Sequence, residues 1–136
     1  MADLSNVRVD GKRLWDSLME MAKIGATPKG GVKRLTLTDL DRQSRELFQQ
    51  WCEAEGCTVT VDEMGNMFAR RPGQDNTLAP VMVGSHLDTQ PTGGKFDGAL
   101  GVLGALEIVR SLNDLNIRTR RPIRSEEHTS ELQSLC

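Results

Sequence analysis

A histidine and two aspartates stand at and just beyond the end of an apolar run. In the stretch VMVGSHLDTQPTGGKFDGALGV, residues 81–102, His86 closes the run, Asp88 follows two residues later, and Asp97 precedes a nearly uncharged segment. Imidazole nitrogens and carboxylate oxygens are common ligands of divalent metal ions. A carboxylate has two oxygens and can bridge two ions about 3.5–4 Å apart. These residue types therefore predict a metal site.

The spacing suggests a role for each of the three side chains. Side chains two residues apart on an extended strand end point the same way, so His86 and Asp88 are expected to lie together. Asp88 can then accept the second ring N–H of the imidazole and fix its tautomer. Asp97 is expected at the mouth of the following helix. Gly93 and Gly94 should let the intervening loop fold back sharply.

Simpler interpretations fit the same residues. A lone histidine at a strand end can bond locally, and Asp97 before a helix can be its N-cap. The segment GGKFDGALG matches neither GxxxxGK[ST] nor GxGxxG, so a nucleotide site is not predicted. The short pattern alone therefore leaves the metal site and the local roles open.

Two amphipathic helices are predicted before this region. Asp10 is a suitable N-cap for the first helix, which should end near Gly25. Thr38 followed by Asp41 resembles a capping box for the second, which should end at Gly56. Both helices carry an apolar stripe that can face a core.

Strands and a buried helix are predicted next. Residues 58–61 and 67–71 alternate around a turn, which indicates a hairpin. Residues 81–83 are continuously apolar, as in a strand covered on both faces. Residues 98–112 are apolar in nearly every direction, and three glycines at every third position from Gly98 should let this helix sit close to a sheet. This order of elements predicts an α/β layer fold.

Composition narrows the possible partners. Lys and Arg total 17 and Asp and Glu total 19, so the net charge of −2 gives no reason to expect nucleic acid or an acidic membrane. No apolar run reaches the roughly 18 residues that span a bilayer. The three cysteines form no CxxC pair, which suits a reducing cytoplasm. A cytoplasmic protein with a small-molecule substrate is expected.

The longer pattern resembles a known family. GSHLDTQPTGGKFDGALGV is similar to the first metal motif of the N-carbamoyl-L-amino-acid hydrolases of the M20 superfamily. Their near relatives are allantoate amidohydrolase and β-ureidopropionase. IGATPKGGVKRLTLTDLDRQSRELF and VDEMGNMFARRPG also resemble the N-terminal segments of that family. The resemblance extends from Met1 to about Ile123.

The resemblance implies a fold, a site and a reaction. The fold would be the N-terminal part of an M20-type α/β/α catalytic domain. His86 would bind one of two divalent ions, zinc or manganese, Asp97 would bridge both, and Asp88 would clamp the ring of His86. The parent protein, meaning the longer protein to which residues 1–123 belong, would remove the carbamoyl group from N-carbamoyl-L-amino acids or ureidopropionate. The products would be an amino acid, ammonia and carbon dioxide.

Other functions stay open. A peptidase or aminoacylase of the same superfamily, or an allantoate amidohydrolase, would use the same motif. A non-catalytic binding fragment that keeps the fold without the metals is the alternative of another class.

The last residues depart from the family. Residues 124–136, RSEEHTSELQSLC, resemble the in-frame translation of a sequencing adapter, which suggests a non-native tail on a truncated domain spanning residues 1–123. Glu126, Glu127 and His128 come too early after Asp97 and lack an apolar strand before them, so none is assigned as a ligand. Glu131 falls near the expected distance but its neighbour is a leucine.

The tail leads to four expectations. The sheet should be incomplete, and the remaining metal ligands should be missing. The second lobe, through which the parent would form a homodimer, should be absent. This chain should therefore be inactive.

Overall fold

The computed structural model describes residues 4–128, which form a mixed α/β fold. The helices are α1 (Gly11–Met21), α2 (Asp39–Ala54) and α3 (Ala99–Asp114), and the strands are β1 (Thr58–Val61), β2 (Met67–Arg71), β3 (Val81–Ser85) and β4 (Ile123–Glu127). The strand order is β1-β2-β4-β3. β4 runs antiparallel to β2 and parallel to β3. The predicted α/β class is confirmed.

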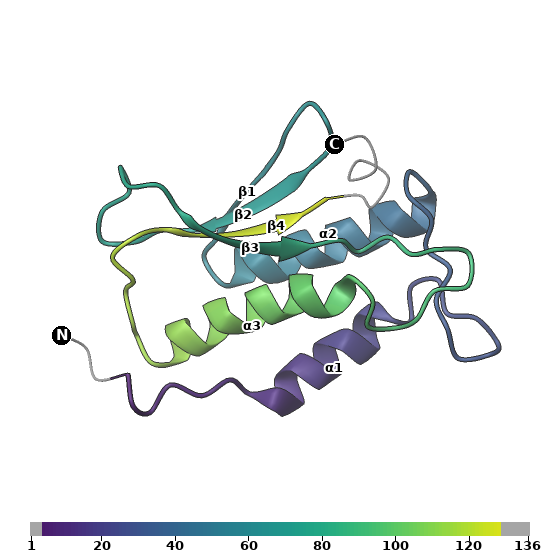
Figure 1. The fold of residues 1–136 in the computed structure, drawn as a ribbon, viewed down its shortest axis with the longest axis horizontal. Coiled ribbons are helices and arrows are strands. Elements are labelled where there is room, and N and C mark those ends of the chain that lie inside the picture. Colours follow the sequence, from purple (N-terminus) through teal and green to yellow (C-terminus); the bar gives the residue numbers. More distant parts are fainter. Residues whose placement is uncertain (1–3, 129–136) are drawn as a thin grey trace.

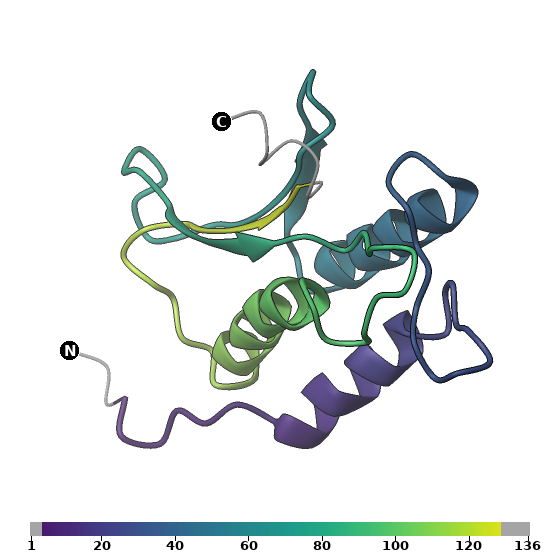
Figure 2. The same cartoon turned by 45° about the vertical axis from the view of Figure 1, so that its right-hand side comes forward.

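The helices gather on one side of the sheet (Figure 1). α2 packs under β1 and β2, and α3 packs under β3 and β4. α1 contacts α3 and forms an outer layer, which Figure 2 shows from a second direction. The described residues thus supply an open sheet and the helices of one face. This is part of the α/β/α arrangement that the sequence predicted.

Both predicted helix starts are confirmed by their caps. The Asp10 carboxylate accepts the backbone N–H of Arg13 at 3.0 Å and begins α1. The Thr38 hydroxyl accepts the N–H of Asp41 at 3.3 Å and begins α2. After α2, Gly56 takes a φ of 79°, a left-handed conformation that glycine adopts without steric cost.

The core lies between the helices and the sheet. Phe48 of α2 is completely buried there, and burying a side chain of this kind contributes about 1.5–3 kcal/mol. The same cluster contains residues of α1, β2, β4 and the middle of α3: Leu18, Met21, Met67, Ala69, Val102, Leu103, Leu106 and Ile123. This cluster fixes α3 beneath β3, and so sets the direction from which α3 approaches the end of that strand.

The α3 glycines are only partly explained by close packing. A Cβ on Gly101 would lie 2.7 Å from the Cβ of Ser85, so the absence of a side chain lets α3 approach β3. Gly104 has nothing within 4 Å of its Cβ position. The prediction that all three glycines serve helix–sheet contact is therefore wrong for Gly104.

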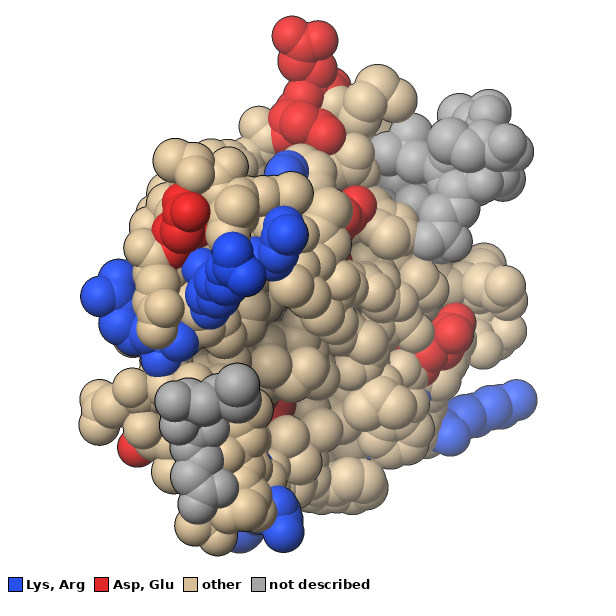
Figure 3. Space-filling view, turned by 60° about the vertical axis from the view of Figure 1, so that its left-hand side comes forward, with Lys and Arg blue, Asp and Glu red and all other residues tan. Residues whose placement is uncertain are grey.

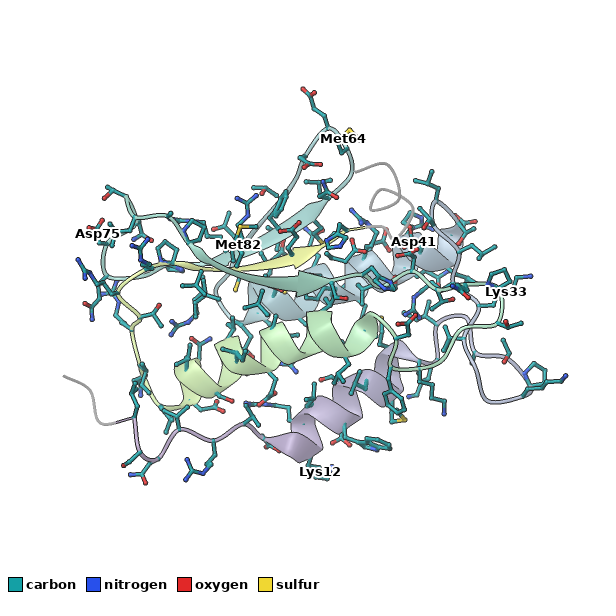
Figure 4. The ribbon with its side chains drawn as sticks, viewed as in Figure 1. Lys12, Lys33, Asp41, Met64, Asp75 and Met82 are labelled. Carbon is teal, nitrogen blue, oxygen red and sulfur yellow. The ribbon has the colours of Figure 1, made fainter. Side chains whose placement is uncertain are left out.

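β3 is less covered than its apolar sequence predicted. Val81 and Met82 are each 52% exposed. Met82 lies on the sheet in Figure 4. Among the described residues β3 is an edge strand, because it pairs with β4 alone, and helices cover only one face of the sheet. The prediction of a strand buried on both faces is wrong for this part of the chain.

β4 is a strand that the sequence pattern did not predict. Ile123–Glu127 pairs on both sides and occupies a central position in the sheet. Ser125 and Glu127 nevertheless point into the buried side, and the Ser125 hydroxyl has no hydrogen-bond partner in the described structure. Backbone pairing with β2 and β3 therefore places β4, although its inward side chains are polar.

Glu127 is the most unusual group in this strand. It is completely buried, forms an ion pair with Arg45 of α2, and accepts the N–H of Leu87 at 3.3 Å. Burial raises the pKa of Glu127 to about 7, because it outweighs the attraction of the Arg45 guanidinium. The neighbouring carboxylates of Asp41 and Asp88 raise this pKa further.

The surface shows no single dominant charge. Figure 3 shows a face on which basic and acidic side chains lie around a broad uncharged area. Within the described part of the chain, none of the helices has the length and apolar character needed to cross a bilayer.

The buried carboxyl group predicts a pH dependence of stability. Between pH 4.5 and about 7, folded Glu127 keeps a proton that the unfolded chain releases, so the free energy of unfolding should fall as pH rises through this window. Urea unfolding of the chain and of Glu127→Gln at pH 4.5, 6 and 7.5 measures this effect. The variant should lose this part of the slope, and equal slopes in both proteins would contradict the assignment.

Candidate metal-binding site

The predicted site residues lie on the loop that joins β3 to α3. This site loop, residues 86–98, leaves the carboxyl end of β3 and turns back to the start of α3. In open α/β sheets, ligands bind in the crevice beyond the carboxyl ends of the strands. The loop lies beside residues 25–38 in both Figure 1 and Figure 2.

His86 is oriented by Asp88. The Nδ1 atom of His86 lies 2.9 Å from the backbone carbonyl of Asp88 and 3.4 Å from its Oδ1 atom. Both neighbours are acceptors, so the ring proton belongs on Nδ1 and Nε2 remains as a lone-pair donor for a metal ion. The predicted proximity of these two side chains is confirmed. The side chain of His86 is 17% exposed, which leaves it accessible.

Asp88 is a buried carboxylate with a bonding partner outside the site loop. Its side chain is only 2% exposed. Its Oδ2 atom accepts the hydroxyl hydrogen of Thr36 at 2.8 Å. Burial suits a residue that holds the imidazole rather than one that faces a substrate.

The start of α3 lies against His86. Gly98 has a φ of 70°, and a Cβ there would meet the carbonyl oxygen of His86 and lie 2.5 Å from its Nδ1. Asp97 is the residue directly before Gly98. The N-cap position is Gly98, with no side-chain cap, so the N-cap alternative for Asp97 is wrong. Asp97 is exposed, and its carboxylate makes no hydrogen bond or ion pair with residues 4–128.

Gly93 shapes the middle of the site loop by close contact. It pairs with Val32 through two backbone hydrogen bonds of 2.9 and 3.0 Å, and a Cβ on it would lie 2.7 Å from the Cβ of Thr89. Neither Gly93 nor Gly94 has a positive φ, and Gly94 has open space around its Cβ position. The predicted sharp turn therefore does not use glycine's conformational freedom at either position; close contact explains the glycine at Gly93, and the structure gives no such reason at Gly94.

A buried arginine that the sequence did not single out holds the loop. Arg34 is 2% exposed, and its guanidinium donates to the carbonyls of Met21 at the end of α1, of Ile24 just after it and of Leu87 in the site loop, at 3.1, 2.7 and 2.8 Å. Burial lowers its pKa, while the carboxylates of Asp41, Asp88 and Glu127 oppose this. An arginine in a predicted loop normally indicates exposure, so the sequence carried no signal for this role.

The acidic residues of β4 do not complete the site. Glu127 is paired with Arg45, and Glu126 lies 3.5 Å from Nδ1 of His128. Within residues 4–128, no group of three or more His, Cys, Asp or Glu side chains could hold a metal ion. Glu131 lies outside the described residues.

His86 and Asp97 fit a metal ion as a partial set of ligands. One supplies an imidazole nitrogen whose other nitrogen is engaged, and the other supplies an exposed carboxylate without a protein partner. Both donor types suit zinc or manganese. The described part of the chain therefore supplies two donors and one orienting carboxylate, and further donors must come from elsewhere in a working site.

Comparison with known proteins identifies relatives along nearly the whole chain. Residues 66–130 match the model of peptidase family M28. The N-carbamoyl-L-amino-acid amidohydrolase of Rhizobium meliloti is 60% identical over 93% of this chain and 30% of its own length. A hydantoinase/carbamoylase family amidase from Burkholderia vietnamiensis has 61% identity and a TM-score of 0.92 over 98% of this chain and 32% of its own. Ureidoglycolate hydrolase of Arabidopsis thaliana is 33% identical over 93% of this chain and 27% of its own length.

These comparisons confirm the amidohydrolase resemblance. The matching family model is that of M28, whereas the motifs suggested the M20 superfamily. The chain spans about 30% of the length of the curated relatives that it matches. The activity of a whole relative therefore cannot be read directly onto these residues.

The contact between Gly98 and His86 can be tested by adding one methyl group. Gly98→Ala should lower the free energy of unfolding by at least about 2 kcal/mol, because alanine disfavours the positive φ and its Cβ meets the His86 carbonyl. Gly104→Ala is the matched control on the same helix. This variant should raise the free energy of unfolding by about 0.5–1 kcal/mol, because alanine favours the helix over glycine and its Cβ meets open space. Urea unfolding measures both, and equal effects would contradict the predicted contact.

Proposed function

We propose that the parent protein of this chain is a metal-dependent hydrolase of linear amides, because the chain is similar to hydantoinase/carbamoylase amidohydrolases. The observation that carries the proposal is the His86–Asp88 pair set against the start of α3, with the exposed Asp97 directly before that start. The proposed substrate class is the N-carbamoyl-L-amino acids, after the activity named for relatives 60% and 39% identical to this chain.

Each residue has a distinct role in this proposal. His86 would hold one metal ion through Nε2, because Asp88 engages Nδ1. Asp97 would supply carboxylate oxygens as the ligand shared by both ions. Asp88 would orient the imidazole without touching metal or substrate, and its carboxylate is buried beside the ring. Zinc or manganese is the proposed metal.

The metal pair supplies Lewis-acid chemistry when bound, polarising the amide carbonyl and lowering the pKa of water. The protein must hold the ligands in place and provide a general base. None of the acidic side chains that the structure describes is assigned as that base. It is proposed to lie in the part of the parent that follows residue 123, together with the remaining ligands.

A related substrate class is the second candidate. The similarity to ureidoglycolate hydrolase favours ureido acids of the allantoate pathway type, which also carry a terminal carbamoyl group. The identity is lower, 33% against 60%, which makes this the weaker candidate. A panel containing N-carbamoyl amino acids, ureidopropionate, allantoate, ureidoglycolate and dipeptides separates these possibilities and the aminoacylase alternative.

We propose that the native sequence departs from this one near Ile123. The inward positions of β4 support this, because the Ser125 hydroxyl is buried without a hydrogen-bond partner and the Glu127 carboxyl group is completely buried beside the carboxylates of Asp41 and Asp88. A genomic read across the codon for Ile123 tests it. If the native gene encodes RSEEHTSELQSLC at this point, the proposal of a non-native tail is wrong.

The proposal also covers the assembly and location of the parent protein. The parent is proposed to form a homodimer through a second lobe, as the family resemblance implied. A cytoplasmic location is proposed because Cys52 and Cys57 are buried and unpaired, as expected of structural thiols in a reducing compartment.

Replacing the proposed ligands should abolish activity in the full-length parent. His86→Ala and Asp97→Asn should each lower kcat/KM for an N-carbamoyl amino acid by more than about 10³-fold, because each removes a proposed metal ligand. Exhaustive chelation should do the same, and zinc or manganese should restore the wild type only. Asp39→Asn, a change of an exposed aspartate on α2, is the control. Full turnover by both ligand variants would refute the proposed site.

This 136-residue chain should not turn over the same substrates. Only two of the donors are present within residues 4–128, and no general base is assigned there. Incubation of the purified chain with zinc or manganese and an N-carbamoyl amino acid, with ammonia release as the measurement, checks this. Clear metal-dependent turnover would show that a complete site forms without the remainder of the parent.

A further inference from the structure

Thr36 lies outside the motif that predicts the metal site, yet it bonds to the carboxylate behind the histidine. We propose that Thr36 is a positioning residue, which fixes the Asp88 carboxylate and through it the His86 ring. This inference rests on the proposed function, since it assigns the orientation of a metal ligand to a residue 50 positions earlier in the chain. It adds a residue to the site that the spacing of His86, Asp88 and Asp97 does not reveal.

The first step is the bond between the hydroxyl and the carboxylate. Oγ1 of Thr36 donates to Oδ2 of Asp88 at 2.8 Å, which fixes one oxygen of the carboxylate. The other oxygen, Oδ1, is then held 3.4 Å from Nδ1 of His86. Because Asp88 is 2% exposed, water cannot readily replace the hydroxyl as a donor. Loss of the hydroxyl should therefore loosen the carboxylate that faces the imidazole.

The second step is the way in which Thr36 itself is held. The next residue, Leu37, takes a φ of 61°, an unusual conformation for leucine, and its N–H donates to Oδ2 of Asp41 at 3.0 Å. Asp41 belongs to the first turn of α2 and is buried. The start of α2 therefore fixes the backbone on the C-terminal side of Thr36.

The third step is the backbone contact on the other side. The N–H of Arg34 donates to the hydroxyl oxygen of Thr89 at 2.8 Å, and the N–H of Thr89 donates to the carbonyl of Arg34 at 2.7 Å. Arg34 also donates to the carbonyl of Leu87 through Nε. Residues 34–36 thus run beside residues 87–89. Figure 4 shows Lys33, the residue just before this run, at the same end of the molecule as Asp41.

These contacts make Thr36 the side-chain link between two rigid supports. The start of α2 fixes the backbone after Thr36 through the bond from Leu37 to Asp41. The bond between Arg34 and Thr89 fixes the spacing between residues 34–36 and residues 87–89. A hydroxyl in such a place orients a metal ligand through one intermediate group. Partners of this kind typically contribute 10–100-fold to metal affinity.

The test uses the full-length parent and zinc alone as the probe. Thr36→Val keeps the shape of the side chain and removes the hydroxyl. It should weaken zinc binding about tenfold, measured by competition with a chromophoric chelator. The KM for substrate at saturating zinc should change by less than about twofold, because Thr36 is not placed at the substrate. Thr36→Ser restores the donor and should return zinc affinity to within about threefold of the wild type.

Two further variants separate positioning from general stability. Thr60→Val, an exposed threonine on the edge strand β1, should leave zinc affinity unchanged. The double variant Asp88→Asn with Thr36→Val should bind zinc almost as tightly as Asp88→Asn alone. The reason is that Thr36 acts on His86 through Asp88, so its effect is already lost when Asp88 is changed. The melting temperature of metal-free Thr36→Val should stay within a few degrees of the wild type.

The outcomes distinguish this inference from the proposed function. If His86→Ala destroys zinc binding but Thr36→Val leaves it within twofold, the positioning role is wrong and the metal site stands. A Thr36→Ser variant as weak as Thr36→Val would likewise refute the role of the hydroxyl. If His86→Ala leaves zinc affinity unchanged, the proposed function itself fails.

Discussion

The buried guanidinium of Arg34 is the interaction on which the site region depends. It donates to the carbonyl of Met21 at the end of α1, to that of Ile24 just after it, and to that of Leu87 in the site loop. The last carbonyls of a helix lack partners within it, so one side chain bonds to the end of α1 and ties it to the site loop. Removing the guanidinium costs about 1–3 kcal/mol for each buried carbonyl that is left without a donor. The site loop is thus fixed before any metal binds.

A second constraint comes from the sheet. The slot between β2 and β3 is filled by β4, and its ladder satisfies the backbone groups on both sides. The inward side chains conflict with this position, because the Ser125 hydroxyl is buried without a hydrogen-bond partner and the Glu127 carboxyl group is buried beside Arg45 and two other carboxylates. Backbone pairing and side-chain burial therefore favour different sequences here. The raised pKa of Glu127 and the unbonded Ser125 hydroxyl are two results of one mismatch.

The site is assembled in layers around His86. The start of α3 approaches the ring through Gly98, Asp88 engages Nδ1, and Thr36 holds Asp88 from residues near α2. Each layer comes from a different element, and the core beneath α3 sets their relative positions. These contacts hold the imidazole of His86 and the carboxylate of Asp88 together, although the site loop has few regular backbone hydrogen bonds.

The helices, their caps, the hairpin and the family resemblance could be predicted from the sequence, because capping residues, glycines and apolar periodicity act over a few neighbouring positions. The proximity of His86 and Asp88 could be predicted too, since a two-residue spacing is local. The burial of Arg34, the bond from Thr36 to Asp88 and the edge position of β3 depend on tertiary contacts and could not be predicted. Tertiary contacts likewise place the polar segment Ile123–Glu127 in the centre of the sheet. These features join residues far apart in the chain, and no local pattern encodes which distant backbone groups will meet.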